Sequence, residues 1–418
     1  MPRFSIGRFA LIVLFATLAA RAWAAEPLRL GDVLEEARRQ NPTLAAVRER
    51  AKAASFKPAQ VSAYDDPTLS WEAWNAPESF DVSRADNNIV RLSQRFPFPG
   101  KRSLAGRAAE QDAEMAARRT DAVDLDLVAS VERAYYALWL AHQKLAIVSR
   151  DKDLVAQFAE IAGQKYAVGQ VSQPDVLRAQ VELTRVINRV TTEKLGIDAA
   201  DADLRALLSR TSADPLGVPE DPPAPRLEAT STALADRAIE KRPELAAAAA
   251  AVRREEEKVR LARLDYFPDF EIGISRFVNF RNRDGLGAMA SLSLPIAEKP
   301  KYDAALGEAE ARLGSAKLEV RRLQDRVRKE VEVAFARART ALSQRDLYLT
   351  THVPQAEQAL AASQIAYQTG KIDFLSLVDS VRAIESLHLE HVEAEADFHE
   401  AMADLERAVG EPIEGGTR

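Results

Sequence analysis

The sequence predicts a mainly α-helical protein with a small β part of four strands, and three observations lead to this prediction. Long segments place apolar residues three and four positions apart, as one buried face of a helix requires. Two short regions instead alternate apolar and polar residues, as strands of a β-hairpin do. The same order of segments occurs twice, so we expect a tandem repeat whose halves contain the same parts.

The duplication is clearest at a Tyr-x-x-Gly motif. Tyr166-x-x-Gly169 recurs as Tyr367-x-x-Gly370, 201 positions further along. Other pairs at this spacing are Pro42 with Pro243, Leu44 with Leu245, and Pro67 with Pro268. We therefore expect a first repeat over residues 25–230 and a second over 231–418.

Composition bounds the class of protein. Apolar residues make up 47% of the chain and charged residues 29%, which is typical of a folded protein. Cysteine is absent, which excludes disulfides and thiolate metal sites. The formal charge of −6 leaves no basic footprint, so nucleic acid is not an expected partner.

Residues 1–24 have the pattern of a signal peptide. Two arginines precede an apolar run over 9–20, and Ala22-Trp23-Ala24 provides the small residues of a cleavage site. The run is too short for a membrane anchor, and no other segment approaches the ~20 apolar residues that a spanning helix needs. A membrane helix is therefore not expected, whereas membrane strands remain possible.

After a helical segment over 30–63 that Pro42 interrupts, the first hairpin is expected over 67–97, and its counterpart over 268–296. The strands approach ten residues, the length that a tilted strand needs to cross a bilayer. A half-buried sheet of a soluble protein shows the same alternation.

Long helices follow each hairpin. The first is expected over 102–166, about 100 Å at 1.5 Å per residue, and the second over 302–367 with a kink at Pro354. Shorter helices are expected over 174–208 and 374–409. Because the shorter helices before and after each long one add up to nearly its length, we expect them to stack end to end beside it and form a wall. Five prolines between 209 and 230 rule out a continuous helix there.

Four strands cannot close a barrel by themselves. Open sheet edges cannot lie in lipid, because their N–H and C=O groups would have no partners. A membrane barrel must therefore be shared by several chains, with eight, twelve or sixteen strands for two, three or four copies.

With these features the chain resembles the TolC family of outer-membrane efflux proteins over nearly its whole mature length. The resemblance rests on the duplicated order of segments, on the two Tyr-x-x-Gly turns, and on the runs 96–102 (Phe-Pro-Phe-Pro-Gly-Lys-Arg) and 65–69 (Asp-Asp-Pro-Thr-Leu). These two runs are most similar to the heavy-metal efflux branch, the CzcC- and CusC-like proteins.

The resemblance implies a homotrimer with a twelve-stranded barrel in the outer membrane and a helical tunnel across the periplasm. It implies a passive conduit for heavy-metal cations, which docks on a periplasmic adaptor and an inner-membrane pump of the proton-driven RND type. Neither catalysis nor a cofactor is expected, and the sequence has no phosphate-cradling loop, His-Glu-x-x-His motif or nucleophile elbow. Two alternatives stay open: a duct for drugs or for type I protein secretion, and a soluble periplasmic coiled-coil scaffold.

The resemblance also assigns roles to the helix turns at the periplasmic tip. A glycine with positive φ closes one helix there, and a polar side chain caps the next. The residues expected to contact the adaptor are Tyr166, Gly169, Ser172, Tyr367, Gly370 and Asp373. An aspartate ring narrows the tunnel entrance in the family, and its two positions fall on Ser376, a departure, and Asp379. Asp175 aligns with Ser376 and is a candidate for the missing charge, while a solvated helix surface is the plainer interpretation of Asp379.

Two further groups are candidate sites. One group ends a strand and begins a helix and consists of Pro97, Pro99, Gly100, Lys101 and Arg102. Its two cations are placed to meet lipid or lipopolysaccharide phosphates at the inner rim of the outer-membrane barrel. A plain turn is the alternative. In the last helix, His388, His391, Glu395 and His399 share one stripe, where neighbouring members could hold Zn²⁺ or Cu²⁺. Histidines packed between helices would show the same spacing.

Overall fold

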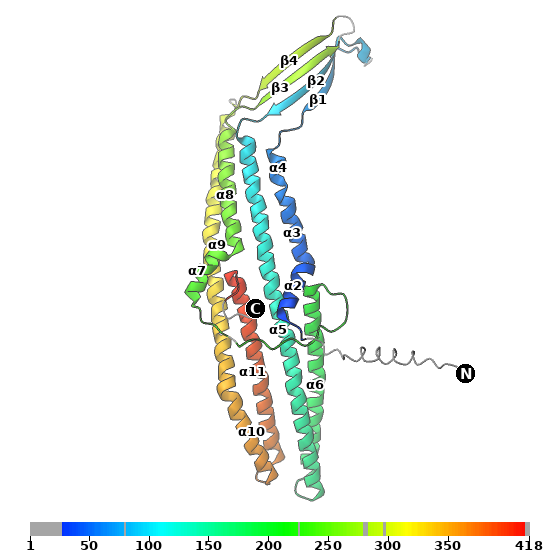
Figure 1. Ribbon diagram of the computed structural model, residues 1–418, viewed down its shortest axis with the longest axis vertical. Coiled ribbons are helices and arrows are strands. Elements are labelled where there is room, and N and C mark those ends of the chain that lie inside the picture. The colour runs from blue at the N-terminus through cyan, green and yellow to red at the C-terminus, as the bar shows by residue number, and fades with distance from the viewer. Residues whose placement is uncertain (1–26, 79–80, 225, 279–282, 296–297, 414–418) are drawn as a thin grey trace, which may run out of the picture.

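The computed structural model describes residues 27–78, 81–224, 226–278, 283–295 and 298–413. The expected signal peptide lies outside these residues. The molecule is a long rod of helices with a β-sheet at one end, and two helical hairpins form the opposite end, which we call the tip (Figure 1).

The sheet contains the four strands that the alternation predicts. They are β1 (Thr68–Trp74), β2 (Asn87–Phe96), β3 (Phe270–Val278) and β4 (Gly285–Leu292). All neighbours are antiparallel in the order β1-β2-β3-β4, so β2 and β3 join the two hairpins into one sheet. The strands measure seven to ten residues. The loop between β1 and β2 also contains a 3₁₀ turn over Val82–Arg84. Within the predicted hairpin 268–296, positions 279–282 lie outside the described residues.

The helices follow the predicted order. In the first half they are α2 (Leu30–Gln40), α3 (Pro42–Ser55), α4 (Lys57–Ser62), α5 (Lys101–Ala167) and α6 (Gln173–Leu208). In the second half they are α7 (Ser231–Lys241), α8 (Pro243–Leu264), α9 (Lys299–Leu347), α10 (Val353–Gln368) and α11 (Phe374–Val409). With 67 residues, α5 is about 100 Å long and is not interrupted.

The predicted kink near Pro354 takes the form of a π-helical turn over Tyr348–His352, which separates α9 from α10. Proline has no N–H to donate, and its ring clashes with the preceding turn, so the backbone widens there. The corresponding position of α5, 201 residues earlier, is Asp153, and α5 continues through it.

Shorter helices line up beside each long helix. In Figure 1, α2 and α3 continue the line of α6 along α5, and α7 and α8 lie above α11 along α9. Three clusters of buried apolar side chains hold this wall together. One lies among α2, α3, α5 and α6, one among α7, α8, α9 and α11, and one near the tip among α5, α6, α10 and α11.

The two stacking joints are built alike. Asn41 precedes the proline that begins α3, and its amide donates to the carbonyl of Leu207 at the end of α6. Arg242 holds the corresponding place before α8, and its guanidinium donates to the carbonyl of Ala408 at the end of α11. Each side chain thus satisfies a helix-terminal carbonyl that would otherwise have no partner.

The proline-rich segment after α6 forms a strap across α5. Its backbone pairs with Leu28 through Val218 and Glu220. The side chain of Tyr135 donates to the carbonyl of Leu28, and the indole of Trp139 donates to Asp221. Two aromatic residues of α5 therefore anchor the strap at the waist of the molecule.

Candidate functional site: the sheet faces and the helical tip

The burial pattern of the sheet is the reverse of that of a soluble protein. Leu69, Ile274 and Leu286 are 71%, 64% and 88% exposed, although they are large and apolar. The register places them with other apolar residues on one face, in the rows Leu69–Leu92–Ile274–Ala288 and Trp71–Val90–Arg276–Leu286. An exposed apolar face of this extent, interrupted in these rows by Arg276 with its partner Asp284, marks a surface that another apolar phase covers.

Small and polar residues predominate on the opposite face, with Ile89, Phe277 and Met289 as large apolar exceptions. Its rows are Thr68–Ser93–Gly273–Met289, Ser70–Arg91–Ser275–Gly287 and Glu72–Ile89–Phe277–Gly285. Ser93 and Ser275 on this face are buried, in contrast to the leucines behind them. Burial therefore indicates a concave polar face and a convex apolar face. Among the described residues, no helix has both the length and the apolar character needed to cross a membrane.

Both helix turns at the tip have the geometry that the Tyr-x-x-Gly motif predicts. Gly169 and Gly370 have φ of 76° and 71°, in the region that favours glycine. In each turn the glycine N–H donates to the tyrosine carbonyl, at 2.9 Å for Tyr166 and 3.1 Å for Tyr367. The tyrosine side chains differ, because Tyr166 is about half exposed and Tyr367 is buried.

The helices that follow the two turns, α6 and α11, begin with the same pair of residue types in opposite order. The first half has Ser172 at the cap and Asp175 three residues later, and the second half has Asp373 at the cap and Ser376 three residues later. Asp373 accepts hydrogen bonds from the N–H (3.0 Å) and hydroxyl (2.6 Å) of Ser376, which leaves Ser376 as part of a cap. These bonds lower the pKa of Asp373. In the first half the order is reversed, and the carboxylate of Asp175 accepts from the N–H (3.2 Å) and hydroxyl (2.7 Å) of Ser172.

The three candidate gate residues therefore have different surroundings. Ser376 and Asp175 are engaged in the caps, and Asp175 also lies 3.6 Å from Arg178. Asp379 is 63% exposed, with Arg382 at 3.7 Å. Of the three, Asp379 presents the most accessible charge to its surroundings.

Sequence reasoning missed the contacts that join the two helical hairpins at the tip. The ammonium of Lys165, at the end of α5, donates to the carbonyl of Tyr367 at 2.6 Å and lies 4.4 Å from the centre of its ring. Further from the tip, Arg382 of α11 makes two bonds to the buried carboxylate of Glu182 on α6, which lower the pKa of Glu182. These partners are about 200 residues apart, so no local pattern indicates them.

A buried carboxyl group lies next to these ion pairs. Burial, together with the charge of Glu385, raises the pKa of Asp151 in α5 to about 6. One carboxyl oxygen of Asp151 has no hydrogen-bond partner among the described residues. Glu385 itself is paired with Arg189 at 2.5 Å, yet burial still raises its pKa.

At the junction of sheet and helices, the side chains of Lys101 and Arg102 contact other residues of the same chain. Lys101 is only 14% exposed and pairs with Asp269 at 3.0 Å and with Asp265 at 3.4 Å. Arg102 donates to the carbonyl of Ser62 and stacks over the ring of Tyr64 at 3.2 Å. The expected contact of Lys101 with lipid phosphates does not fit this geometry, because two carboxylates of the chain already pair with its charge. Arg102 has no carboxylate partner among the described residues, so its predicted contact with lipid stays a prediction.

Asp269 is the centre of this junction, and sequence reasoning missed it. Its carboxylate accepts from the N–H of Phe98 at 2.8 Å, from Lys101 and from Arg95. Pro97, Pro99 and Gly100 form the turn around it, and Gly100 has φ of 101°. The turn alternative therefore accounts for this motif.

The histidine stripe does not form a metal centre. His399 is 1% exposed and stacks on Tyr136, and burial lowers its pKa to about 4. Glu395 pairs with Arg345, whereas His388 lies beside Glu357. Across the described ranges, no group of three or more His, Asp or Glu side chains is arranged to hold a metal ion. The candidates are separated because their stripe divides between the helix interior and the surface.

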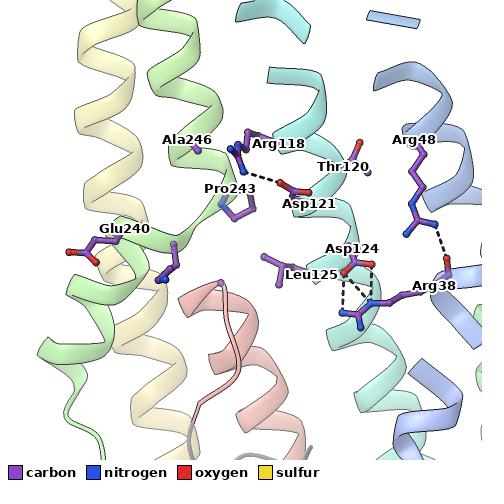
Figure 2. A pocket seen from close by; sticks show the side chains of 12 residues that line it. Arg38, Arg48, Arg118, Thr120, Asp121, Asp124, Leu125, Glu240, Pro243 and Ala246 are labelled. Atoms are coloured by element: carbon purple, nitrogen blue, oxygen red, sulfur yellow. Dashed lines mark hydrogen bonds and ion pairs between the residues drawn. The ribbon is translucent and has the colours of Figure 1, made fainter. Parts of the chain in front are cut away.

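A recess at the waist between α3, α5 and α8 is lined by charged side chains (Figure 2). Arg38 is paired with Asp124 at 3.0 Å, and Arg48 donates to the carbonyl of Arg38. Arg118 points to Asp121 (Figure 2). The recess is therefore a network of internal ion pairs, and its composition does not indicate a reaction.

Comparison with known proteins agrees with this architecture. The profile of the outer membrane efflux protein family matches residues 33–210 and again 234–411. The chain is similar to the cobalt-zinc-cadmium resistance protein CzcC of Cupriavidus metallidurans, with 23% identity over 396 residues, which cover 93% of this chain and 91% of CzcC. It is also similar to the protein CyaE of Bordetella pertussis, with 28% identity over 75% of this chain and 69% of CyaE. The multidrug resistance outer membrane protein MdtP of Shigella flexneri is 24% identical over 65% of this chain and 60% of MdtP.

Solved structures share the fold. CusC superposes with a TM-score of 0.77 and 17% identity, over 92% of this chain and 93% of CusC. The outer membrane protein VceC of Vibrio cholerae has a TM-score of 0.75 and 19% identity, over 93% of this chain and 97% of VceC. Because the family profile covers both halves, the protein is an outer-membrane efflux channel rather than an enzyme. The chain belongs to the outer membrane efflux protein family.

Proposed function

We propose that three copies of the chain close a twelve-stranded barrel in the outer membrane, and that their helices form one tunnel across the periplasm. The exposed apolar face of the sheet carries this proposal. Its edge strands β1 and β4 have unpaired backbone groups on their outer sides, and pairing β4 of one chain with β1 of the next satisfies them. The barrel then presents Leu69, Ile274 and Leu286 to lipid and the polar face to water.

Adjacent positions on β4 test this arrangement. Ala288 lies on the apolar face and Met289 on the polar face, and both are in the middle of the strand. Ala288→Arg places a charge in hydrocarbon at a cost of about 2–4 kcal/mol, whereas Met289→Arg places it in the lumen. We expect the first variant to lose outer-membrane trimers and the second to keep them, as native mass spectrometry of detergent extracts measures. Equal yields of trimer from both variants would contradict the proposal.

We further propose that the cargo is divalent transition-metal cations, which an inner-membrane pump of the RND type delivers through a periplasmic adaptor. The similarity to CzcC, which extends over nearly the whole of both chains, supports this choice. The similarity to MdtP makes drugs the second candidate. In a deletion strain, we expect sensitivity to zinc, cadmium or cobalt to rise and the plasmid-borne gene to restore resistance. Sensitivity to antibiotics alone would favour the second candidate.

For the tip we propose that the two turns contact the adaptor and that Asp379 contributes to a like-charge ring at the entrance. Three copies of an exposed carboxylate would repel one another as the entrance narrows. In planar bilayers, Asp379→Asn is expected to lower the cation preference of the channel. Glu357→Asn, also exposed but on α10, is the matched control. If both variants conduct as the wild type does, the ring is not at Asp379.

A further inference from the structure

We propose that Arg91 forms a ring of positive charge inside the barrel and makes this level of the pore favour anions over cations, in contrast to the acidic ring proposed for the tip. This inference deepens the proposed barrel and rests on it. Arg91 lies in the middle of β2 on the polar face, in one row with Ser70, Ser275 and Gly287. In a threefold barrel, symmetry places the three copies of Arg91 at one height, where they form a ring.

No counter-charge belongs to this ring. Within the described residues, Arg91 has no ion pair or hydrogen bond to its guanidinium, and its Nε atom is buried without a partner. Its two neighbours in the row are serines, and the fourth member is a glycine. The other side chains of the row are therefore small and uncharged, and none of them neutralises the guanidinium.

The nearest charged rows on the polar face differ from that of Arg91. Towards the helices, the adjacent row of Ser93 is uncharged, and two rows away Arg95 lies opposite Glu271 and is paired with Asp269, so that level is neutralised. Glu72 belongs to the row on the other side, about two residues or 6–7 Å further along the strands. The strands beside β2 in the closed barrel are β1 and β3 of the same chain, so no neighbouring subunit places an acid next to Arg91.

The consequence is a positive potential at mid-barrel. A pump imposes its outward flux on the tunnel, whereas passive entry of external cations depends on their concentration at each level of the pore. A ring that lowers the local concentration of cations therefore reduces leakage into the tunnel more than it reduces driven export. The effect is electrostatic and should weaken with salt.

The absence of cysteine from the sequence allows a direct measurement of this potential. Ser70→Cys introduces a single thiol directly across from Arg91. Purified trimers in detergent, whose mass is checked first, are treated with methanethiosulfonates that carry either a sulfonate or a trimethylammonium group. The ratio of the two rates reports the local potential, because a change in the thiol pKa affects both reagents equally. The ratio of the two rates does not depend on whether the tip is closed or open, because the reagents reach the barrel from its outer mouth.

We expect the anionic reagent to be preferred by roughly fivefold at 0.1 M salt over the ratio in an Arg91→Gln background, and the preference to vanish near 1 M. Arg276→Gln is the matched control, since Arg276 lies one row away on the apolar face and pairs with Asp284. It should leave the ratio unchanged. An equal ratio with and without Arg91 would overturn the inference, as would a thiol at position 70 that stays unreactive in a verified trimer. A sample that is not trimeric would instead refute the barrel on which the inference rests.

Discussion

The two halves of the chain contain the same elements but build equivalent joints from different chemistry. At the stacking joint, a neutral amide from Asn41 caps α6, whereas the charged Arg242 caps α11. Arg242 is 3% exposed and also pairs with Glu244 and Glu330. The first half thus depends on a local cap, and the second on a buried network of charges.

The long helices differ in the same sense. α5 runs without a break from sheet to tip, whereas the second half divides its path at the π-helical turn into α9 and α10. The comparison indicates that the first half is a rigid frame and that the second contains the site of bending. Four pairs of substitutions test this difference.

The largest difference is expected at the stacking joints. Arg242→Ala removes the buried guanidinium that bonds the carbonyl of Ala408 and pairs with Glu244 and Glu330, although Arg407 stays beside both carboxylates. We expect a loss of about 3–4 kcal/mol in the free energy of unfolding. Asn41→Ala removes both the cap on the end of α6 and the N-cap of α3, and should cost about 1–2 kcal/mol. Thermal unfolding of the detergent-solubilised protein compares them. Equal losses would mean that the two joints are energetically alike.

Exchanging the proline between the long helices should be the next largest effect. Asp153→Pro interrupts α5 at the position that corresponds to Pro354 and should cost about 3 kcal/mol. Pro354→Ala restores a donor to a backbone that is already bent, so we expect a change below about 1 kcal/mol. Unfolding by denaturant measures both. A tolerated proline at 153 would show that α5 is not the rigid member.

The buried Asp151 should give the first half an unusual dependence on pH. Its pKa is about 6 in the folded chain and near 3.8 when unfolded, so the folded state holds the proton more tightly. Its contribution to stability is therefore present at low pH and is lost as the pH rises from about 4 through 6. Asp151→Asn should remove this slope and stabilise the protein at pH 7 by about 1–3 kcal/mol. Asp153→Asn, an exposed carboxylate two residues on, should leave the slope intact, and an unchanged slope in both variants would contradict the assignment.

The smallest difference is expected at the tip caps. Asp373 accepts two hydrogen bonds, so Asp373→Ala should destabilise the start of α11 by about 1 kcal/mol. Ser172 and Asp175 form a capping box at the start of α6, and in Ser172→Ala the carboxylate of Asp175 can still accept from the N–H of residue 172, so this variant should cost less. Hydrogen exchange of the two turns separates these outcomes. If Ser172→Ala accelerates exchange of the backbone amides in its turn more than Asp373→Ala does in the other turn, the order of the two effects is wrong.

The elements themselves could be predicted from sequence because their signals are local. Period-two alternation identifies all four strands, and the positive φ of Gly169 and Gly370 follows from the glycine in each turn. The boundaries of α11 match the predicted 374–409 because Asp373 and Gly410 mark its ends.

The side-chain partners could not be predicted. Asp269 gathers Arg95, Phe98 and Lys101 from about 170 residues away, and Lys165 meets Tyr367 across two hairpins. Local spacing left two interpretations of the histidines open, because spacing on one helix does not show that His399 packs against Tyr136 on another. Contacts of this kind depend on how the two halves are placed together.

The most direct test of the shared barrel uses its open edges. Ser70→Cys on β1 is combined, in turn, with a cysteine at each position from 286 to 290 on β4, and the membranes are oxidised. A barrel of three chains predicts that at least one combination gives covalent dimers and closed trimers, with nothing larger. Bonds within single chains only, or a ladder that continues beyond three chains, would contradict the account.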